Sequence, residues 1–239
     1  MINFLGKTRQ QLFSQNKVSK YILYAIGEIV LVVIGILIAL QINNWNEDKK
    51  VNIFEKKLLE DLFPFVEMNM WQLDVSIKGS ERKIKSAEII LTHLENNLPY
   101  HDSLDYHFSR AISWNHPTIK NTAYETLKTY GMNTIKNDSL RIKLGLYEKG
   151  WLEIFNSRLH DYHYSTASPI LVELFESVEF GGEMKPNDYE ELQKSKKYAT
   201  VLRTCIANRN AQIKWYSQWL EDLGELANMI TIELKENQN

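Results

Sequence analysis

The sequence predicts an all-α protein with one N-terminal transmembrane helix followed by an up-and-down, extracytoplasmic helical bundle. Three observations lead to this prediction. Residues 21–42 form an apolar run with a single charged side chain, Glu28. Apolar residues after the run recur every three or four positions, as they do on one face of a helix. The 239-residue chain has only 10 glycines and 5 prolines, which is typical of long helices rather than of a β-sandwich or barrel.

Residues 1–20 are predicted to be a basic, amphipathic segment on the cytoplasmic side of a membrane. Lys7, Arg9, Lys17 and Lys20 precede the apolar run, and no acidic residue accompanies them. Positive charge next to a span marks its cytoplasmic end. The chain after the span is therefore expected on the other side of the membrane.

The apolar run, residues 21–42, has the length of a membrane-spanning helix. At about 1.5 Å per residue it extends ~33 Å, enough to cross a ~30 Å hydrocarbon layer. Glu28, Val32, Gly35 and Ala39 fall near one face of this helix. Two small residues four positions apart let a second backbone approach closely, so these four residues are predicted to form a polar packing seam between spans.

Two other roles for Glu28 stay open. Its side chain can reach the lipid boundary or stay protonated, with no function. Alternatively, it can serve as a proton or ion site. No small-x-small cleavage site follows the run, so a retained anchor is favoured over a cleaved signal peptide.

Residues 43–239 are predicted to form the bundle, with about six helices and some shorter helical pieces. Pro64 should kink or break the first helix, because proline lacks a backbone N–H donor. Gly79 and Ser80 should form a turn. The periodic stretches place helices over residues 47–78, 81–97, 103–113, 122–130, 138–164, 168–181, 189–196 and 198–235.

Local signals set several boundaries in the second half of the chain. Gly131 is expected to end a helix, because glycine readily adopts the conformation required there. Asn137 or Asp138 should cap the following helix. Residues 181–188 have the composition of a loop.

The residues around the apolar run also resemble a known family. The resemblance is carried by residues 24–29 (YAIGEI) and 33–47 (VIGILIALQINNWNE), and it continues weakly through residues 122–127 and 135–141. The run resembles an uncharacterised family of bacterial single-span membrane proteins, mostly from the Bacteroidota, described only as a domain of unknown function. The resemblance implies membrane anchoring and a helical extracytoplasmic region, and in a Gram-negative cell the predicted topology puts the anchor in the inner membrane and that region in the periplasm. It implies no activity and transfers no catalytic residue.

No motif in the sequence predicts a reaction. The lone Cys205 excludes a disulfide within the chain and a cysteine-based zinc cluster. His160 and His163 lie three apart but lack a third metal ligand, and the common hydrolase and nucleotide-binding motifs are absent. A formal charge of −2 without a basic face argues against nucleic acid. We predict no catalytic residue, cofactor or metal.

Aromatic residues provide the candidate binding surface of the bundle. Trp215, Tyr216 and Trp219 crowd one helical stretch, and Trp151 lies in another. Large aromatic residues at helical spacing most often belong to a core. Otherwise they line a ligand pocket or a partner surface, where tryptophan and tyrosine are enriched.

The function that these observations predict is a membrane-anchored periplasmic binding or interaction protein, acting as a scaffold or accessory. Its expected partners are the lipid bilayer and either further copies of the chain, joined through the span, or another envelope protein. Two alternatives belong to other classes. One is an oligomeric ion or proton pathway that uses Glu28, and the other is an enzyme with an unrecognised helical site.

Overall fold

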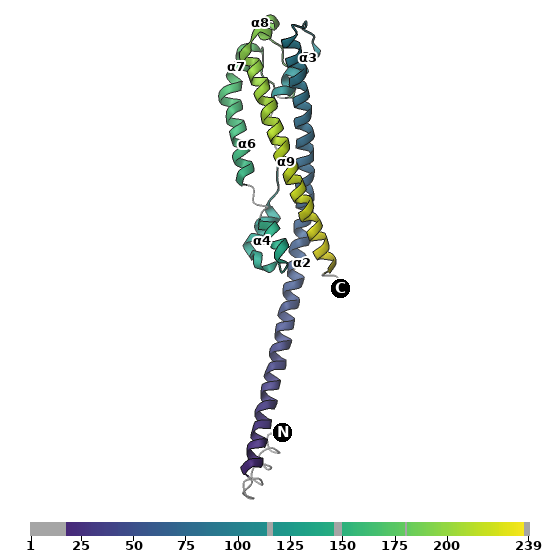
Figure 1. The fold of residues 1–239 in the computed structure, drawn as a ribbon, viewed down its shortest axis with the longest axis vertical. Helices are drawn as coiled ribbons and strands as arrows, with labels where there is room; N and C mark the ends of the chain where they lie inside the picture. The colour runs from purple at the N-terminus through teal and green to yellow at the C-terminus, as the bar shows by residue number, and fades with distance from the viewer. Residues whose placement is uncertain (1–17, 114–116, 146–149, 180, 237–239) are drawn as a thin grey trace. The chain divides into compact units, whose positions relative to one another are not determined.

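The computed structural model describes residues 18–113, 117–145, 150–179 and 181–236 (Figure 1). The predicted cytoplasmic segment, residues 1–20, lies almost wholly outside the described residues and stays a prediction. The described residues form helices joined by loops, with one isolated bridge between Phe175 and Pro186 and no strand. The all-α prediction is confirmed. The chain divides into two compact units, Met1–Glu55 and Lys56–Asn239.

Unit 1, Met1–Glu55, contains the first part of helix α2 (Val18–Glu95). The large apolar side chains between Ile22 and Ile42 are all exposed, by about half of their surface or more. So much exposed apolar surface is costly in water. By length and composition this stretch can cross a membrane, and a signal sequence would pass the same test.

Helix α2 runs through both positions where the sequence predicted an interruption. Pro64 lies inside the helix, and its own side chain is exposed while Leu62 and Val66 beside it are buried. Proline removes one backbone hydrogen bond, but burial of its neighbours holds the helix together. Gly79 and Ser80 are buried helical residues, so the turn predicted there is wrong.

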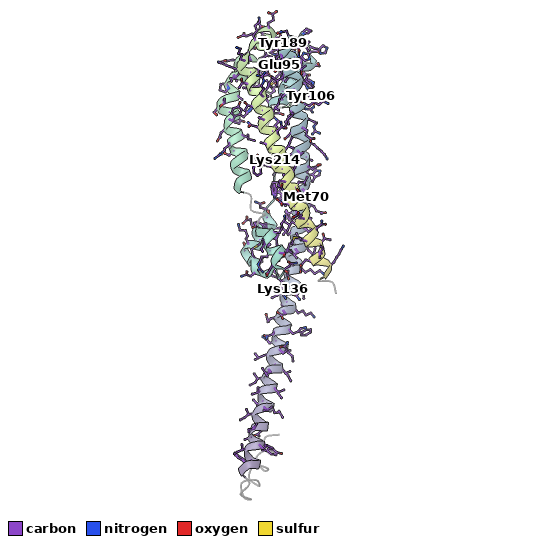
Figure 2. All side chains as sticks on the ribbon, viewed as in Figure 1. Met70, Glu95, Tyr106, Lys136, Tyr189 and Lys214 are labelled. Carbon is purple, nitrogen blue, oxygen red and sulfur yellow. The ribbon has the colours of Figure 1, made fainter. Side chains whose placement is uncertain are left out.

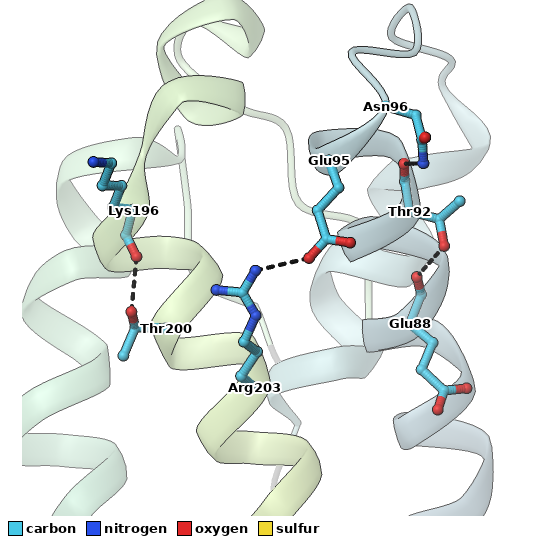
Figure 3. A network of polar contacts seen from close by, with 7 residues as sticks. All are labelled: Glu88, Thr92, Glu95, Asn96, Lys196, Thr200 and Arg203. Atoms are coloured by element: carbon cyan, nitrogen blue, oxygen red, sulfur yellow. Dashed lines mark hydrogen bonds and ion pairs between the residues drawn. The ribbon is translucent and has the colours of Figure 1, made fainter.

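Unit 2, Lys56–Asn239, is built around helix α9 (Lys196–Glu236), which confirms the long C-terminal helix that the sequence predicts. Residues 56–95 of α2 lie antiparallel to α9, because residue numbers rise along one helix as they fall along the other at successive contacts. Figure 3 shows the first of these contacts, an ion pair at the end of α2. The contacts are Glu95–Arg203 at 2.7 Å, Ser80–Gln212 at 3.2 Å and Met70 against Gly224.

A second helical row also lies antiparallel to α9, which appears between this row and α2 in Figure 1. The row consists of α5 (Asp138–Gly145), α6 (Gly150–Tyr162) and a π-helical turn, η2 (His163–Ala167). Of the single helix expected over residues 138–164, the structure describes α5 and α6 as helical, and residues 146–149 lie outside the described part. The contacts with α9 are Asn137–Glu233, Lys143–Asp222, Lys143–Glu225 and Asn156–Tyr216.

Short helices complete unit 2: α3 (Ser103–Ile112), α4 (Thr122–Tyr130), the 3-10 turn η1 (Met132–Thr134), α7 (Ser168–Leu174) and α8 (Tyr189–Lys194). Helix α7 ends well before Gly181, where the sequence predicted its end. The backbone turns extended at Phe175, which brings its ring against Phe108 and Tyr198 at centroid distances of 5.2 and 5.4 Å. Glu95 and Tyr189 lie at one end of the unit and Lys136 at the other (Figure 2).

Candidate functional site

The predicted seam residues lie in unit 1. Glu28, Val32, Gly35 and Ala39 are all exposed on α2. A Cβ atom added to Gly35 would meet no atom within 4 Å, so this part of the helix surface is open to another helix. Association of copies through these residues stays a prediction.

The predicted aromatic surface does not form as a unit. Trp215 is 48% exposed, but Tyr216 and Trp219, on the side of α9 that faces the core, are buried at 0% and 6%. The last two are therefore core residues and not part of an exposed surface. Trp151 belongs to α6, and its side chain lies outside the described residues.

Two adjoining hollows in unit 2 form a site that the sequence did not single out, and both are bordered by Lys83 and Ser113. The inner hollow lies between α2, α9 and the α6–η2 row and has about 30 Å³ open to the centre of a water molecule. The outer hollow has about 240 Å³. The inner lining includes Ser80, Leu159, His163, Cys205, Arg209 and Gln212. The outer lining includes Val75, Gly79, Arg82, Tyr106, Arg110 and Gly182.

Four cationic side chains border these hollows: Arg82 and Lys83 on α2, Arg110 on α3 and Arg209 on α9. Among the residues that the structure describes, none of the four is within ion-pair distance of a carboxylate. An acidic residue does stand near the outer hollow, because a Cβ added at Gly182 would come within 2.6 Å of the Glu179 carboxylate. The hollows nevertheless carry an excess of positive charge.

Two of the guanidinium groups are held in place by neighbours. Arg209 is only 9% exposed, and it donates to the backbone oxygens of Cys205 at 3.2 Å and Ser113 at 3.1 Å. The Arg110 guanidinium lies over the Tyr106 ring, 4.4 Å from its centroid. A planar cation fixed in this way keeps little freedom to lose when it binds a ligand.

Lys83 differs from an ordinary lysine in its protonation. Burial, and after it the charges of Arg209, Arg110 and Arg82, together lower the pKa of its amine to about 7. Burial disfavours the charged ammonium form, and like charges nearby have the same effect. Near neutral pH, Lys83 is therefore present in both charged and neutral forms.

The inner hollow has a hydrogen-bonded polar floor. Ser80 donates to Gln212 at 3.2 Å, Gln212 donates to the Tyr216 hydroxyl at 2.9 Å, and this hydroxyl donates to Asn156 at 3.0 Å. Burial raises the pKa of Tyr216 to about 12, so the hydroxyl keeps its proton. Burial, followed by the Arg209 charge, lowers the pKa of His163, so this imidazole is neutral near pH 7.

A sequence signal for this site existed in the buried stripe of α2. Between the core residues Leu73 and Ala87, the inward-facing positions at helical spacing are Ser76, Ser80 and Lys83. A polar interruption of an apolar stripe marks a place where the core contains polar groups. The partner cations on α3 and α9 give no such signal, because surface arginines are common.

Searches against known proteins identify a family and no activity. The protein family described as "Family of unknown function (DUF6090)" matches residues 28–194. Neither curated proteins nor solved structures give a match to the chain. The matched region includes the seam residues and Lys83, and it ends before Arg209. Among the described residues, no group of three or more His, Cys, Asp or Glu is placed to hold a metal ion.

Proposed function

The chain belongs to the DUF6090 family of unknown function, and we propose that it is a single-span inner-membrane protein whose periplasmic helical bundle binds a small ligand in the hollows at Lys83. One observation carries the binding role. Four cations, one of them almost fully buried, converge on two hollows where no described carboxylate pairs with them. Unpaired buried charge is costly to maintain, so a site that keeps it is a candidate for function.

The anchoring role is supported by the surface of unit 1. Residues 21–42 expose apolar side chains over a length that matches a membrane. The basic residues before the span support a cytoplasmic N-terminus and a periplasmic, up-and-down bundle over residues 43–239. Copies of the chain associate through the seam at Glu28 and Gly35.

Retention of a ligand during purification tests the binding role. Native mass spectrometry of the full chain, extracted from its own membranes in a mild detergent, should show a bound small molecule. Arg110→Gln should lose it, because the variant removes a charge that lines the outer hollow. Lys85→Gln is the matched control, since Lys85 is exposed on α2 and lines neither hollow. Equal occupancy in both variants, or none in the wild type, would contradict the proposal.

Single cysteines in a Cys205→Ser background test the seam and the orientation. Cysteines at positions 28, 32, 35 and 39 should form intermolecular disulfides, whereas those at Ile29 and Leu40 should not. Gly35→Leu should weaken association, because its side chain blocks close backbone approach. Crosslinks at Ile29 and Leu40 instead would mean that the spans associate through another face of the helix, which would refute the proposed seam.

The orientation of the chain in the membrane is tested with one further single-cysteine variant in the same Cys205→Ser background. A cysteine at the exposed position Glu67 should react with a membrane-impermeant thiol reagent in cells with a permeabilised outer membrane. Labelling only after the inner membrane is disrupted would reverse the proposed topology.

An enzyme is the second candidate, and one observation favours it. An amine that is partly neutral near pH 7 can act as a general base or nucleophile. Lys83→Arg separates the two functions, because it keeps the positive charge for binding but removes the titrating amine.

A further inference from the structure

We infer that the hollows at Lys83 are a binding site for a compact oxyanion, one whose carboxylate, phosphate or sulfate group lies in the outer hollow beside the α2 and α3 cations, with the α9 cation at the adjoining inner hollow. This inference rests on the proposed binding function and gives the chemical class of the ligand. Its basis is the arrangement of Arg82 and Arg110 at the outer hollow, Arg209 at the inner hollow, and Lys83 at the border of both.

Charge is the first argument for an anion. Arg209 is buried, and its guanidinium donates to two backbone oxygens, which satisfy hydrogen bonds but leave its charge unneutralised. Arg82 and Arg110 add two further charges at the outer hollow. A ligand with at least two negative charges would neutralise most of this excess, and a neutral or cationic ligand would not.

Geometry is the second argument. Guanidinium groups donate two parallel N–H bonds to carboxylate, phosphate or sulfate oxygens, and such charge-assisted bonds are among the strongest in proteins. Arg209 is fixed by its bonds to Cys205 and Ser113, and Arg110 is fixed by its contact with Tyr106. Arg110 is thus positioned at the outer hollow before a ligand arrives, which lowers the entropy that binding must overcome, and Arg209 adds a fixed charge at the adjoining inner hollow.

Size limits the ligand. The outer hollow, at about 240 Å³, is smaller than most drug-sized pockets, and Val75 and Tyr106 form an apolar part of its wall. The inner hollow, at about 30 Å³, holds no more than a water or two. The oxyanion therefore occupies the outer hollow, with water against the polar floor at Ser80 and Gln212.

Proton uptake accompanies binding. An anion beside Lys83 favours the ammonium form and restores the pKa of the amine from about 7 toward its ordinary value. Between about pH 7 and 10 the empty site is largely neutral at Lys83, so binding takes up a proton there. Below about pH 7 the amine is already charged, and binding takes up none.

Other groups around Lys83 do not change the sign of this effect. The hollows are also lined by Arg82, Arg110, Arg209, His163, Cys205, Tyr106 and Tyr162. His163 has a lowered pKa and is already neutral above pH 7. Glu179 lies beside Gly182 at the outer hollow, and its negative charge opposes the binding of an anion.

Calorimetric titration of the full chain in an uncharged detergent tests the inference. Sulfate is the first probe, because it does not titrate near neutral pH, and phosphate and citrate follow at constant ionic strength. Comparison of two buffers with different ionisation enthalpies gives the number of protons taken up. We expect binding with proton uptake approaching one near pH 8.5 and close to zero near pH 6.

Three variants sharpen the test. Lys83→Arg should bind sulfate without pH-dependent proton uptake. Arg110→Gln should bind about 10-fold more weakly or worse, because one charge-assisted contact is lost. Lys85→Gln removes the same charge from an exposed position of α2 and should bind as the wild type does.

The source of the oxyanion is distinguished in nanodiscs. Sulfate binding is measured in nanodiscs of phosphatidylcholine, with and without phosphatidylglycerol. Loss of sulfate binding in the presence of phosphatidylglycerol identifies a lipid headgroup as the natural ligand. Unchanged sulfate binding identifies a free anion. Failure of all three probes to bind would overturn the inference. The broader binding function would still stand if native mass spectrometry shows a bound molecule that Arg110→Gln loses.

Discussion

Replacing Phe108 with alanine is expected to lower the free energy of unfolding by about 3–5 kcal/mol. Phe108 is fully buried in α3, and its ring contacts those of Phe175 and Tyr198, at centroid distances of 5.2 and 6.4 Å. Truncation removes buried apolar surface and two ring contacts and leaves a cavity that rigid neighbours cannot fill. Urea unfolding of the full chain in detergent, followed by circular dichroism, measures the loss.

Trp71→Ala is the matched control for this prediction. Trp71 is larger than Phe108 but is 61% exposed on α2, so its removal should cost less than about 1 kcal/mol. Phe108→Leu keeps most of the volume and should fall between the two. A Phe108→Ala variant no less stable than Trp71→Ala would mean that the three-ring cluster does not hold unit 2 together.

Several elements of unit 2 could be predicted because short-range signals determine them. Gly131 ends α4 with a φ of 98°, a conformation that favours glycine. Asn137 caps α5, since its side chain accepts from the Leu140 amide at 3.1 Å. The apolar spacing in α9 was sufficient to place its ends within two residues.

The errors arose where distant residues decide local structure. Gly79 and Ser80 are turn-forming residues, but they lie in α2 because small side chains fit its buried face, where Ser80 bonds to Gln212 on α9. Phe175 ends α7 early because its ring packs against α3 and α9. No sequence pattern near either position specifies these partners.

Apart from the polar interruption of the α2 stripe, the candidate site could not be predicted, for the same reason. Lys83 and Arg209 are 126 positions apart in the sequence, and they meet only because α2 and α9 pack antiparallel. A lysine or arginine in a helix is ordinarily a solvated residue. Without the pairing of the helices, four such residues are unremarkable, and the sequence instead directed attention to aromatic residues that pack in the core.

Lys83→Met is expected to stabilise unit 2 near neutral pH, by about 2–3 kcal/mol at about pH 7. The lowered pKa of Lys83 means that burial of its charged form opposes folding. The full shift, from 10.5 to about 7, corresponds to about 5 kcal/mol, and partial contact with solvent reduces the effective value. Methionine has a similar shape and no charge, so it removes this cost without leaving a cavity.

The lowered pKa of Lys83 also determines how the stability of the wild type changes with pH. Between about pH 7 and 10 the unfolded chain holds a proton on Lys83 that the folded chain has partly released, so the stability of the wild type rises with pH. Below about pH 7 the cost is fully present. The window from about pH 7 to 9.5 avoids His107 and His163, whose lowered pKa values act below it. It also avoids Tyr216, whose raised pKa acts above it.

Urea unfolding at about pH 7 and about pH 9.5 measures both effects in one series. The advantage of Lys83→Met should fall to about 1 kcal/mol at the higher pH, because the wild-type amine has largely lost its charge there. Lys85→Met, at an exposed position of the same helix, should show neither the gain nor the pH slope. The buffer must contain no sulfate or phosphate, because an oxyanion in the hollow would restore the charge of Lys83 and pair with it. Addition of sulfate should therefore stabilise the wild type more than Lys83→Met. If the stability of the wild type did not change with pH in this window, Lys83 would be solvated like an ordinary surface lysine.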